Sequence, residues 1–260
     1  MLKNIINPTL SQSEVSEILT LFHNQARAVL GDRLVALYLT GSLAIGDFDP
    51  ATSDIDFVAV TAVHLASEEI AGLERMHAAI AQSGLKFADK LEGSYITREA
   101  LRRYDPQDGP FPCVIEEYFY LARHESYWVL TRHILRECGV VLYGPSPREL
   151  IDPVSAEDIR QAILGYLHEW WKPMLQNPVK LKNTEYQAYA VLSMCRAIYT
   201  LSTGKLASKS ESAKWALDHL EAKWSQLLHW ALEWNILPPA DHQSDTEALI
   251  SDVVIMYGIE

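Results

Sequence analysis

The feature that most constrains this chain is a Gly-Ser pair at the end of one apolar run and two aspartates at the start of the next. The run LVALYLT ends at Gly41 and Ser42, and the run IDFVAVT begins directly after Asp54 and contains Asp56. In a β-strand, residues i and i+2 point to the same face, about 6–7 Å apart, so the two carboxylates project side by side. Like charges held this close repel one another unless a cation lies between them. The pattern therefore predicts a strand edge that binds a cation.

A third expected strand and the turn before the aspartates add to this chemistry. In residues 89–97 the alternation DKLEGSYIT places Glu92 on a polar strand face. If this strand neighbours the one that begins after Asp54, Glu92 can share a metal ion or act as a general base. Carboxylates are suitable ligands for Mg²⁺, and substrate phosphates can complete the coordination shell of this ion. Gly41 permits a tight turn in which amide groups and the Ser42 hydroxyl can bind phosphate oxygens.

Each of these residues also has an ordinary structural interpretation. Aspartates and Gly-Ser pairs are common turn residues at strand ends, and a D-x-D pair alone is a weak signal. A single acidic residue such as Glu92 is more often a solvated strand residue. The combination of all three features on successive strands is far more specific, and it favours a phosphate-binding and metal-binding site.

The hydrophobic periodicity divides the chain into a mixed part and a helical part. The first hundred residues predict helix, strand, strand, helix and strand in that order. Residues 104–112, rich in Pro, Gly and Asp, predict a loop, which a helix and a short strand follow. Beyond the prolines of residues 145–153 the pattern is helical, with N-terminal caps expected at Ser155 and Asn183.

Length and these patterns together predict two domains. A chain of 260 residues can bury a sizeable core, and its proline-rich segment is the best candidate for a domain boundary. We therefore expect an α+β chain. A domain with a small mixed sheet should occupy residues 1–150, and an all-α helical bundle should occupy residues 151–260.

Charge and cysteine content narrow the partners and the compartment. The formal net charge is −12, from 34 acidic and 22 basic residues. Such a surface repels nucleic-acid phosphates and attracts cationic small molecules, although many cytoplasmic proteins are acidic for solubility alone. The three cysteines are far apart and form no C-x-x-C motif, and no apolar run approaches the ~20 residues of a membrane span. We expect a cytoplasmic protein without nucleic-acid or membrane partners.

The motif resembles the signature of the nucleotidyltransferase superfamily related to DNA polymerase β, hG[GS] followed by [DE]h[DE]h. The matching residues are Thr40–Ser42 and Asp54–Phe57. The later stretch LSMCRAIYTLSTGKLASKSESAKWAL is similar to the helical domain of bacterial aminoglycoside adenylyltransferases of the 3″/9-O type, which modify streptomycin and spectinomycin. The resemblance extends from Leu34 to Trp234.

This resemblance implies a polymerase-β-like nucleotidyltransferase domain followed by a helical domain, with ATP and Mg²⁺ bound between them. The implied catalytic and metal-binding residues are Asp54, Asp56 and Glu92, with Glu92 as the base. The implied ATP contacts are Gly41, Ser42, Ser53, Arg196 and Lys209. A lysine that follows a helix-ending glycine turn is also, on chemical grounds, a sensible mobile cation for a polyphosphate.

The resemblance further implies a monomer that transfers AMP to a hydroxyl of an aminoglycoside or aminocyclitol. Two parts of the pattern depart from the family. The adenine-stacking aromatic residue has no clean counterpart, with Trp234 as the nearest candidate, and the loop 104–118 does not match the residues that select the antibiotic. Glu116, Glu117 and Glu185 could bind substrate ammonium groups or form a solvated face.

Two alternatives stay open at this point. The same chemistry could act on another metabolite or on a protein, and a catalytically weak nucleotide sensor or toxin–antitoxin-type partner could keep the fold. The presence of three carboxylates argues against the second alternative, because nothing structural requires three acids around one pocket.

Overall fold

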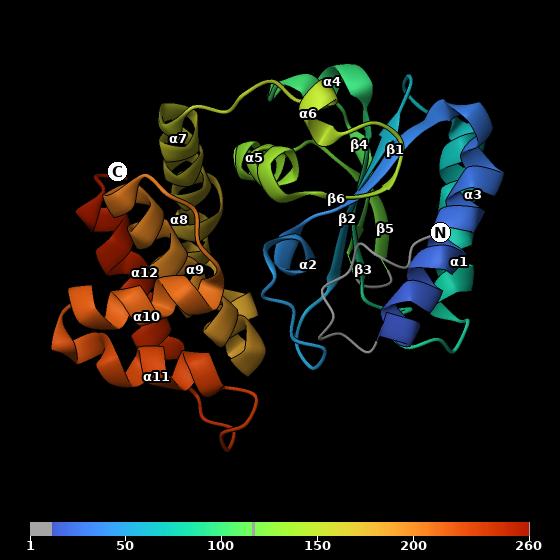
Figure 1. The fold of residues 1–260 in the computed structure, drawn as a ribbon. Helices are drawn as coiled ribbons and strands as arrows, with labels where there is room; N and C mark the ends of the chain where they lie inside the picture. Colours follow the sequence, from blue (N-terminus) through green and yellow to red (C-terminus); the bar gives the residue numbers. More distant parts are fainter. Residues whose placement is uncertain (1–11, 116–117, 260) are drawn as a thin grey trace. The chain divides into compact units, whose positions relative to one another are not determined.

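The protein folds into two compact units. The structure, a computed structural model, describes residues 12–115 and 118–259. The first unit comprises Met1–His124 and Trp128–Val154, and the second comprises Glu125–Tyr127 and Ser155–Glu260. In the described residues the first unit holds the β-sheet and the second is helical, so the expected α+β fold class is confirmed (Figure 1).

The first unit is built on a mixed six-stranded sheet, counted over the described residues, with the order β5-β4-β3-β2-β1-β6. The β2–β3 pair is parallel, and the other neighbouring pairs are antiparallel. The strands are β1 (Leu34–Leu39), β2 (Ile55–Thr61), β3 (Leu91–Thr97), β4 (Phe111–Ile115), β5 (Tyr118–Ala122) and β6 (Val140–Tyr143). The helical segments of this unit are α1 (Gln12–Leu30), η1 (Gly31–Arg33), α2 (Gly41–Ile45), α3 (Ser67–Ala81), α4 (Arg98–Arg102), α5 (Trp128–Cys138) and α6 (Pro147–Leu150).

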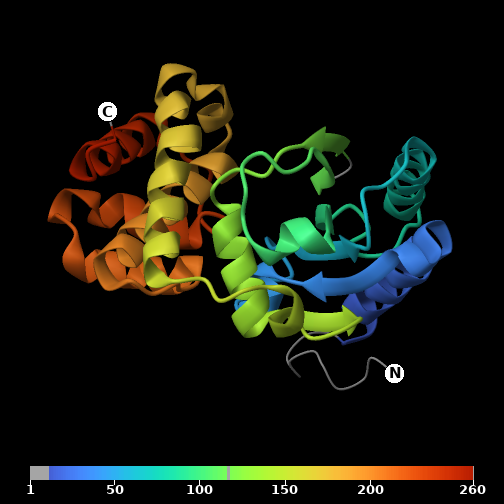
Figure 2. The same cartoon turned by 90° about the horizontal axis from the view of Figure 1, so that it is seen from above.

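Helices cover both faces of this sheet, and alternate strand residues supply the two cores. In both views α1 and α3 lie on one side of the sheet and α5 lies on the other (Figure 1, Figure 2). Phe57 and Tyr95 are buried in the core beneath α1 and α3. Val58 and Ile96, one residue further along the same strands, are buried in the opposite core with Trp128 of α5. The sheet is thus buried on both faces, which explains the continuous apolar runs of β1 and β2.

Part of the segment that was expected to be a loop belongs to the hairpin formed by β4 and β5. Residues 104–112 were expected to form a loop, but β4 begins at Phe111 and includes Pro112. Cys113 pairs with Ser94 of β3, so this segment becomes a strand through a partner distant in the chain. Local composition does not carry that information, because proline and glycine are typical loop signals.

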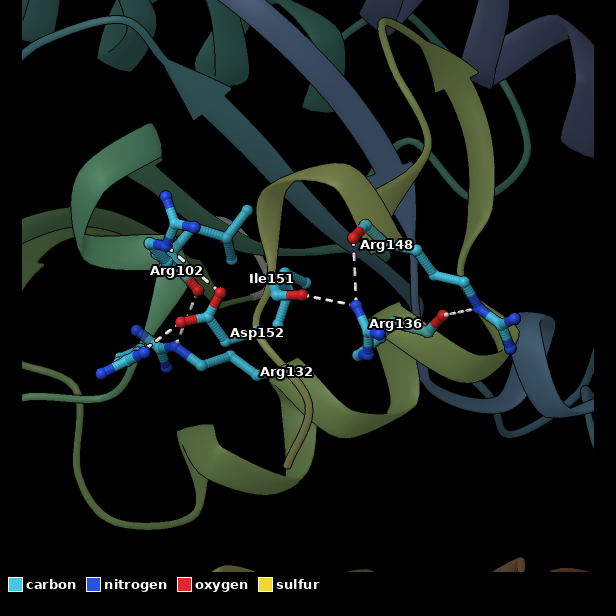
Figure 3. Close-up of polar contacts among 8 residues, drawn as sticks. Arg102, Arg132, Arg136, Arg148, Ile151 and Asp152 are labelled. Atoms are coloured by element: carbon cyan, nitrogen blue, oxygen red, sulfur yellow. Dashed lines mark hydrogen bonds and ion pairs between the residues drawn. The ribbon is translucent and has the colours of Figure 1, made fainter. Parts of the chain in front are cut away.

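Arginine side chains hold the last segment of the first unit against its helices (Figure 3). Arg102 and Arg103 donate to the two carboxylate oxygens of Asp152 at 3.2 and 2.5 Å. Arg136 of α5 donates to the carbonyl oxygen of Ile151 at 2.6 Å. The acceptors Ile151 and Asp152 follow α6. Their hydrogen bonds attach the segment that leads to the second unit to helices of the first unit.

The second unit is a bundle around one long helix. Helix α9 (Thr184–Thr203) packs against α7 (Ala156–Tyr166), α10 (Lys209–His219), α11 (Ser225–Glu233) and α12 (Gln243–Met256). The remaining helical segments are η2 (Leu167–Trp171), α8 (Lys172–Gln176), η3 (Pro178–Lys182) and η4 (Ala222–Trp224). In the described part of the chain, no helix combines the length and the apolar character needed to cross a membrane.

Side-chain caps set the helix boundaries that the sequence predicts. The Ser155 hydroxyl accepts a hydrogen bond from the Asp158 amide at the start of α7. The Asn183 side chain accepts one from the Tyr186 amide at the start of α9. Helix α9 is followed by Gly204, whose φ of 69° is left-handed. Both predicted caps are confirmed.

Candidate functional site

The predicted carboxylates lie where two adjacent strands begin. In the parallel pair of β2 and β3, Asp56 is directly opposite Glu92. Asp54 immediately precedes β2, and Lys90 immediately precedes β3. Because side chains alternate along a strand, Asp54, Asp56 and Glu92 share the sheet face on which Val58 is buried. The two strands are thus neighbours, as the suggested role of Glu92 requires.

The turn at Gly41 lies directly against Asp56. The Thr40 amide donates to the Asp56 carbonyl oxygen at 3.0 Å, which joins the end of β1 to the start of β2. Gly41 has a φ of 58°, and a Cβ atom placed there would overlap the Asp56 carboxylate. Glycine is therefore needed for the left-handed backbone and for the room that the carboxylate occupies.

This contact predicts the effect of adding one methyl group. Gly41→Ala should lower kcat/KM for the nucleotidyl transfer that the family resemblance implies by about a hundredfold, because the new Cβ displaces the Asp56 carboxylate. Gly46→Ala is the matched control, since Gly46 has a φ of 79° and a Cβ atom placed there would meet nothing within 4 Å. Both variants should lose about 1 kcal/mol of stability from the left-handed backbone. Equal activities of the two variants, measured by pyrophosphate release, would contradict a role for the Gly41–Asp56 contact.

Asp54 forms an ion pair with the lysine beside it. The Lys90 Nζ atom lies 3.3 Å from Asp54 Oδ1, and the two side chains are 40% and 38% exposed. The pair joins the residues that precede β2 and β3. The pairing of Lys90 with Asp54 appears only in the folded chain.

The loop between α2 and Asp54 is organised by Asp49. Its carboxylate accepts hydrogen bonds from the Ala51 amide at 2.9 Å and from the Thr52 hydroxyl at 3.1 Å. Its amide donates to the Ser53 hydroxyl oxygen at 3.0 Å. Ser53, a predicted phosphate contact, is thereby fixed next to Asp54. Ser42, the other predicted serine, lies in the short helix α2 and is half-buried.

A buried polar chain lies on the same face, two residues beyond Glu92. Ser94 is fully buried, and its hydroxyl donates to the Pro112 carbonyl at 3.1 Å. The His124 Nε2 atom lies 2.9 Å from the Ser94 hydroxyl oxygen. Burial lowers the pKa of His124 to about 2, so this imidazole is neutral at physiological pH. These residues anchor β3 behind Glu92, and no local sequence signal links positions this far apart.

The second unit holds the predicted cations around a pair of tyrosines. The Tyr166 and Tyr189 hydroxyl oxygens lie 3.1 Å apart. Lys209 Nζ lies 4.6 Å from the centre of the Tyr189 ring. The positive charge of Arg196 acts on half-buried Tyr166, although desolvation is the larger effect and raises the pKa of Tyr166. The structure thus places Arg196 and Lys209 in one region of the second unit.

The other candidate substrate and nucleotide contacts are less defined. Glu185 is exposed in the first turn of α9, and Trp234, which follows α11, is half-buried. Glu116 and Glu117 lie outside the described residues. Their expected roles stay predictions.

The carboxylates suit Mg²⁺ in their chemistry. Asp54, Asp56 and Glu92 offer hard oxygen ligands on one sheet face beside a glycine turn. Within residues 12–115 and 118–259, no three His, Cys, Asp or Glu side chains form a cluster that could hold a metal ion by itself. A site that holds Mg²⁺ through one or two carboxylates and the nucleotide phosphates needs no such cluster.

Family models match both parts of the chain. Residues 24–106 match the nucleotidyltransferase domain, and residues 149–256 match the C-terminal domain of aminoglycoside adenylyltransferases. The chain thus combines a nucleotidyltransferase domain with a C-terminal domain of the aminoglycoside adenylyltransferase type. The first match contains the three carboxylates, and the second contains Arg196 and Lys209.

Relatives and a solved structure agree with these matches. The chain is 33% identical over 93 residues to the aminoglycoside (3″)(9) adenylyltransferase of Klebsiella pneumoniae, covering 36% of this chain and 33% of the relative. The corresponding protein of Rhizobium radiobacter is 30% identical over 112 residues, 41% of this chain and 37% of the relative. The chain thus aligns with about a third of the length of these curated relatives.

The similarity in structure extends further than the similarity in sequence. The spectinomycin adenyltransferase AAD(9) of Enterococcus faecialis, solved with ATP and spectinomycin, superposes with a TM-score of 0.73. The match covers 92% of this chain and 99% of that one at 17% identity. At 17% identity this similarity shows that the two proteins share a fold.

Proposed function

We propose that this protein transfers the AMP group of ATP to a hydroxyl group of a cationic small molecule and releases pyrophosphate. The observation that carries the proposal is the placement of Asp54, Asp56 and Glu92 on one sheet face, beside the turn at Gly41. The matches to a nucleotidyltransferase domain and to the C-terminal domain of aminoglycoside adenylyltransferases support the reaction class.

In the proposed reaction, Glu92 accepts the proton of the acceptor hydroxyl as its oxygen attacks the α-phosphorus of ATP. The bond between the α-phosphorus and the oxygen that bridges to the β-phosphate breaks, and its electron pair leaves with pyrophosphate. Backbone amides at Gly41 and the hydroxyl groups of Ser42 and Ser53 are proposed to orient the phosphates. Positioning of this kind supplies much of the catalysis in phosphoryl transfer.

Charge on the triphosphate has to be balanced in this site. Asp54 and Asp56, with Glu92 beside them, would hold Mg²⁺. When bound, Mg²⁺ supplies positive charge that stabilises the phosphate oxygens and the departing pyrophosphate. Arg196 and Lys209 of the second unit are proposed to pair with the triphosphate as well.

The proposed acceptor is an aminoglycoside or aminocyclitol such as streptomycin or spectinomycin. The names of the curated relatives and of the solved structure support this class of acceptor. The net charge of −12 supports a cationic substrate on independent physical grounds.

The proposal is tested by pyrophosphate release from ATP and Mg²⁺ with a panel of acceptors. The panel contains streptomycin, spectinomycin, a kanamycin-type aminoglycoside and a control without acceptor. We expect release with streptomycin or spectinomycin and only background release in the control. Asp54→Asn should abolish the acceptor-dependent release.

Two results would change the proposal in different ways. Full activity of Asp54→Asn would show that the reaction takes place elsewhere. Absence of release with every acceptor, while ATP still stabilises the protein in a thermal-shift assay, would overturn the proposed acceptor class and point to another metabolite or a protein.

A further inference from the structure

The ion pair between Lys90 and Asp54 places a built-in cation at the proposed metal site. Lys90 Nζ lies 3.3 Å from Asp54 Oδ1. The parallel register that sets Asp56 opposite Glu92 also sets Lys90 beside Asp54, one step before the strands begin. The pair is therefore a product of the sheet and not of sequence proximity.

The charges on this sheet face explain why a cation is needed before any metal arrives. Three carboxylates, Asp54, Asp56 and Glu92, project from the beginnings of β2 and β3. Negative charges on neighbouring positions of one sheet face repel one another unless a cation lies beside them. A lysine is a compact point charge on a flexible stem, so it can neutralise a carboxylate and later move away. The 40% exposure of the Lys90 side chain leaves it room to do so.

We propose that Lys90 is a resident counter-ion of Asp54 that competes with the divalent cation for the same carboxylate. This inference rests on the proposed function, because it concerns the same nucleotide-dependent site. The ammonium group keeps Asp54 in place while the site is empty of metal. Binding of a divalent cation to Asp54 then displaces the ammonium group, so Lys90 weakens intrinsic metal affinity and acts as a positioning residue.

The test measures Mn²⁺ binding to the nucleotide-free protein from the electron paramagnetic resonance signal of free Mn²⁺. Lys90→Met should bind Mn²⁺ about three to five times more tightly than the wild type, the scale of a partly exposed ion pair. Lys90→Gln is a second neutral variant with the same expectation. Lys90→Arg keeps the charge and should bind Mn²⁺ like the wild type.

Lys86→Met is the matched control. Lys86 lies in the same loop and is paired with Glu14 at 2.8 Å, away from the carboxylates. Its replacement changes the net charge by the same amount as Lys90→Met, so a general charge effect would move both variants equally. We expect unchanged Mn²⁺ affinity for Lys86→Met. Equal affinities of Lys86→Met and Lys90→Met, or weaker Mn²⁺ binding by Lys90→Met, would overturn the proposal.

The failure of this inference differs visibly from the failure of the proposed function. Acceptor-dependent pyrophosphate release by the wild type, together with equal Mn²⁺ affinities of all Lys90 variants, overturns the counter-ion role alone. A wild type that neither binds Mn²⁺ nor releases pyrophosphate with any acceptor overturns both. Asp54→Asn in the Lys90→Met background should remove the gain in Mn²⁺ affinity, because the carboxylate for which lysine and metal compete is gone.

Discussion

Glu92→Gln should lower kcat for AMP transfer by about 10²–10⁴-fold, the usual contribution of a general base. Glutamine preserves the size of the side chain and the pairing of β3 with β2, but it cannot accept the proton of the acceptor hydroxyl. ATP affinity should change little, because the variant alters the side chain proposed to activate the acceptor and leaves the turn at Gly41, proposed to bind the phosphates, unchanged. Steady-state pyrophosphate release at saturating ATP and acceptor measures the effect.

Asp89→Asn is the matched control for this variant. Asp89 is exposed and lies in the turn just before Lys90 and β3. Its substitution removes one negative charge, as Glu92→Gln does, and should leave kcat unchanged. A kcat for Glu92→Gln within about tenfold of the wild type would contradict the assignment of Glu92 as the base.

Arg132→Met should lower the free energy of unfolding by about 2–4 kcal/mol, because it leaves buried carbonyl groups without donors. Arg132 is 2% exposed, and it donates to the carbonyl oxygens of Ala100 at 2.7 Å and Leu101 at 3.2 Å. These carbonyls belong to the last turn of α4, where the carbonyl groups have no hydrogen-bond partner within the helix. Burial lowers the pKa of Arg132 to about 10, so the group is still charged at neutral pH.

Arg103→Met is the control for Arg132→Met, because it removes an arginine that is exposed instead of buried. The Arg103 side chain is 81% exposed and pairs with Asp152 at 2.5 Å. Its loss should change stability by less than about 1 kcal/mol, as for other exposed ion pairs. Urea unfolding of both variants measures the difference. Equal losses of stability would contradict the view that Arg132 acts through the carbonyls of α4.

Local patterns in the sequence predict much of the fold correctly. The runs that became β1, β2 and β3 are apolar or alternating and bounded by turn residues, and the helices α7 and α9 begin at the expected caps. The β4–β5 hairpin was missed because β4 pairs with β3 across a stretch rich in proline and glycine, and β5 pairs with β4. Sheet pairing between distant segments, rather than local propensity, decides such strands.

The sequence by itself determined the chemical groups of the candidate site and the order of its elements. The D-x-D spacing places both aspartates on one strand face, since alternation is a property of every β-strand. Only the tertiary structure decided that Asp56 lies opposite Glu92, that Asp56 fills the space beside Gly41, and that Lys90 pairs with Asp54. Those contacts depend on which strands become neighbours and in which register, and that choice is made by the packing of the whole sheet between its helices.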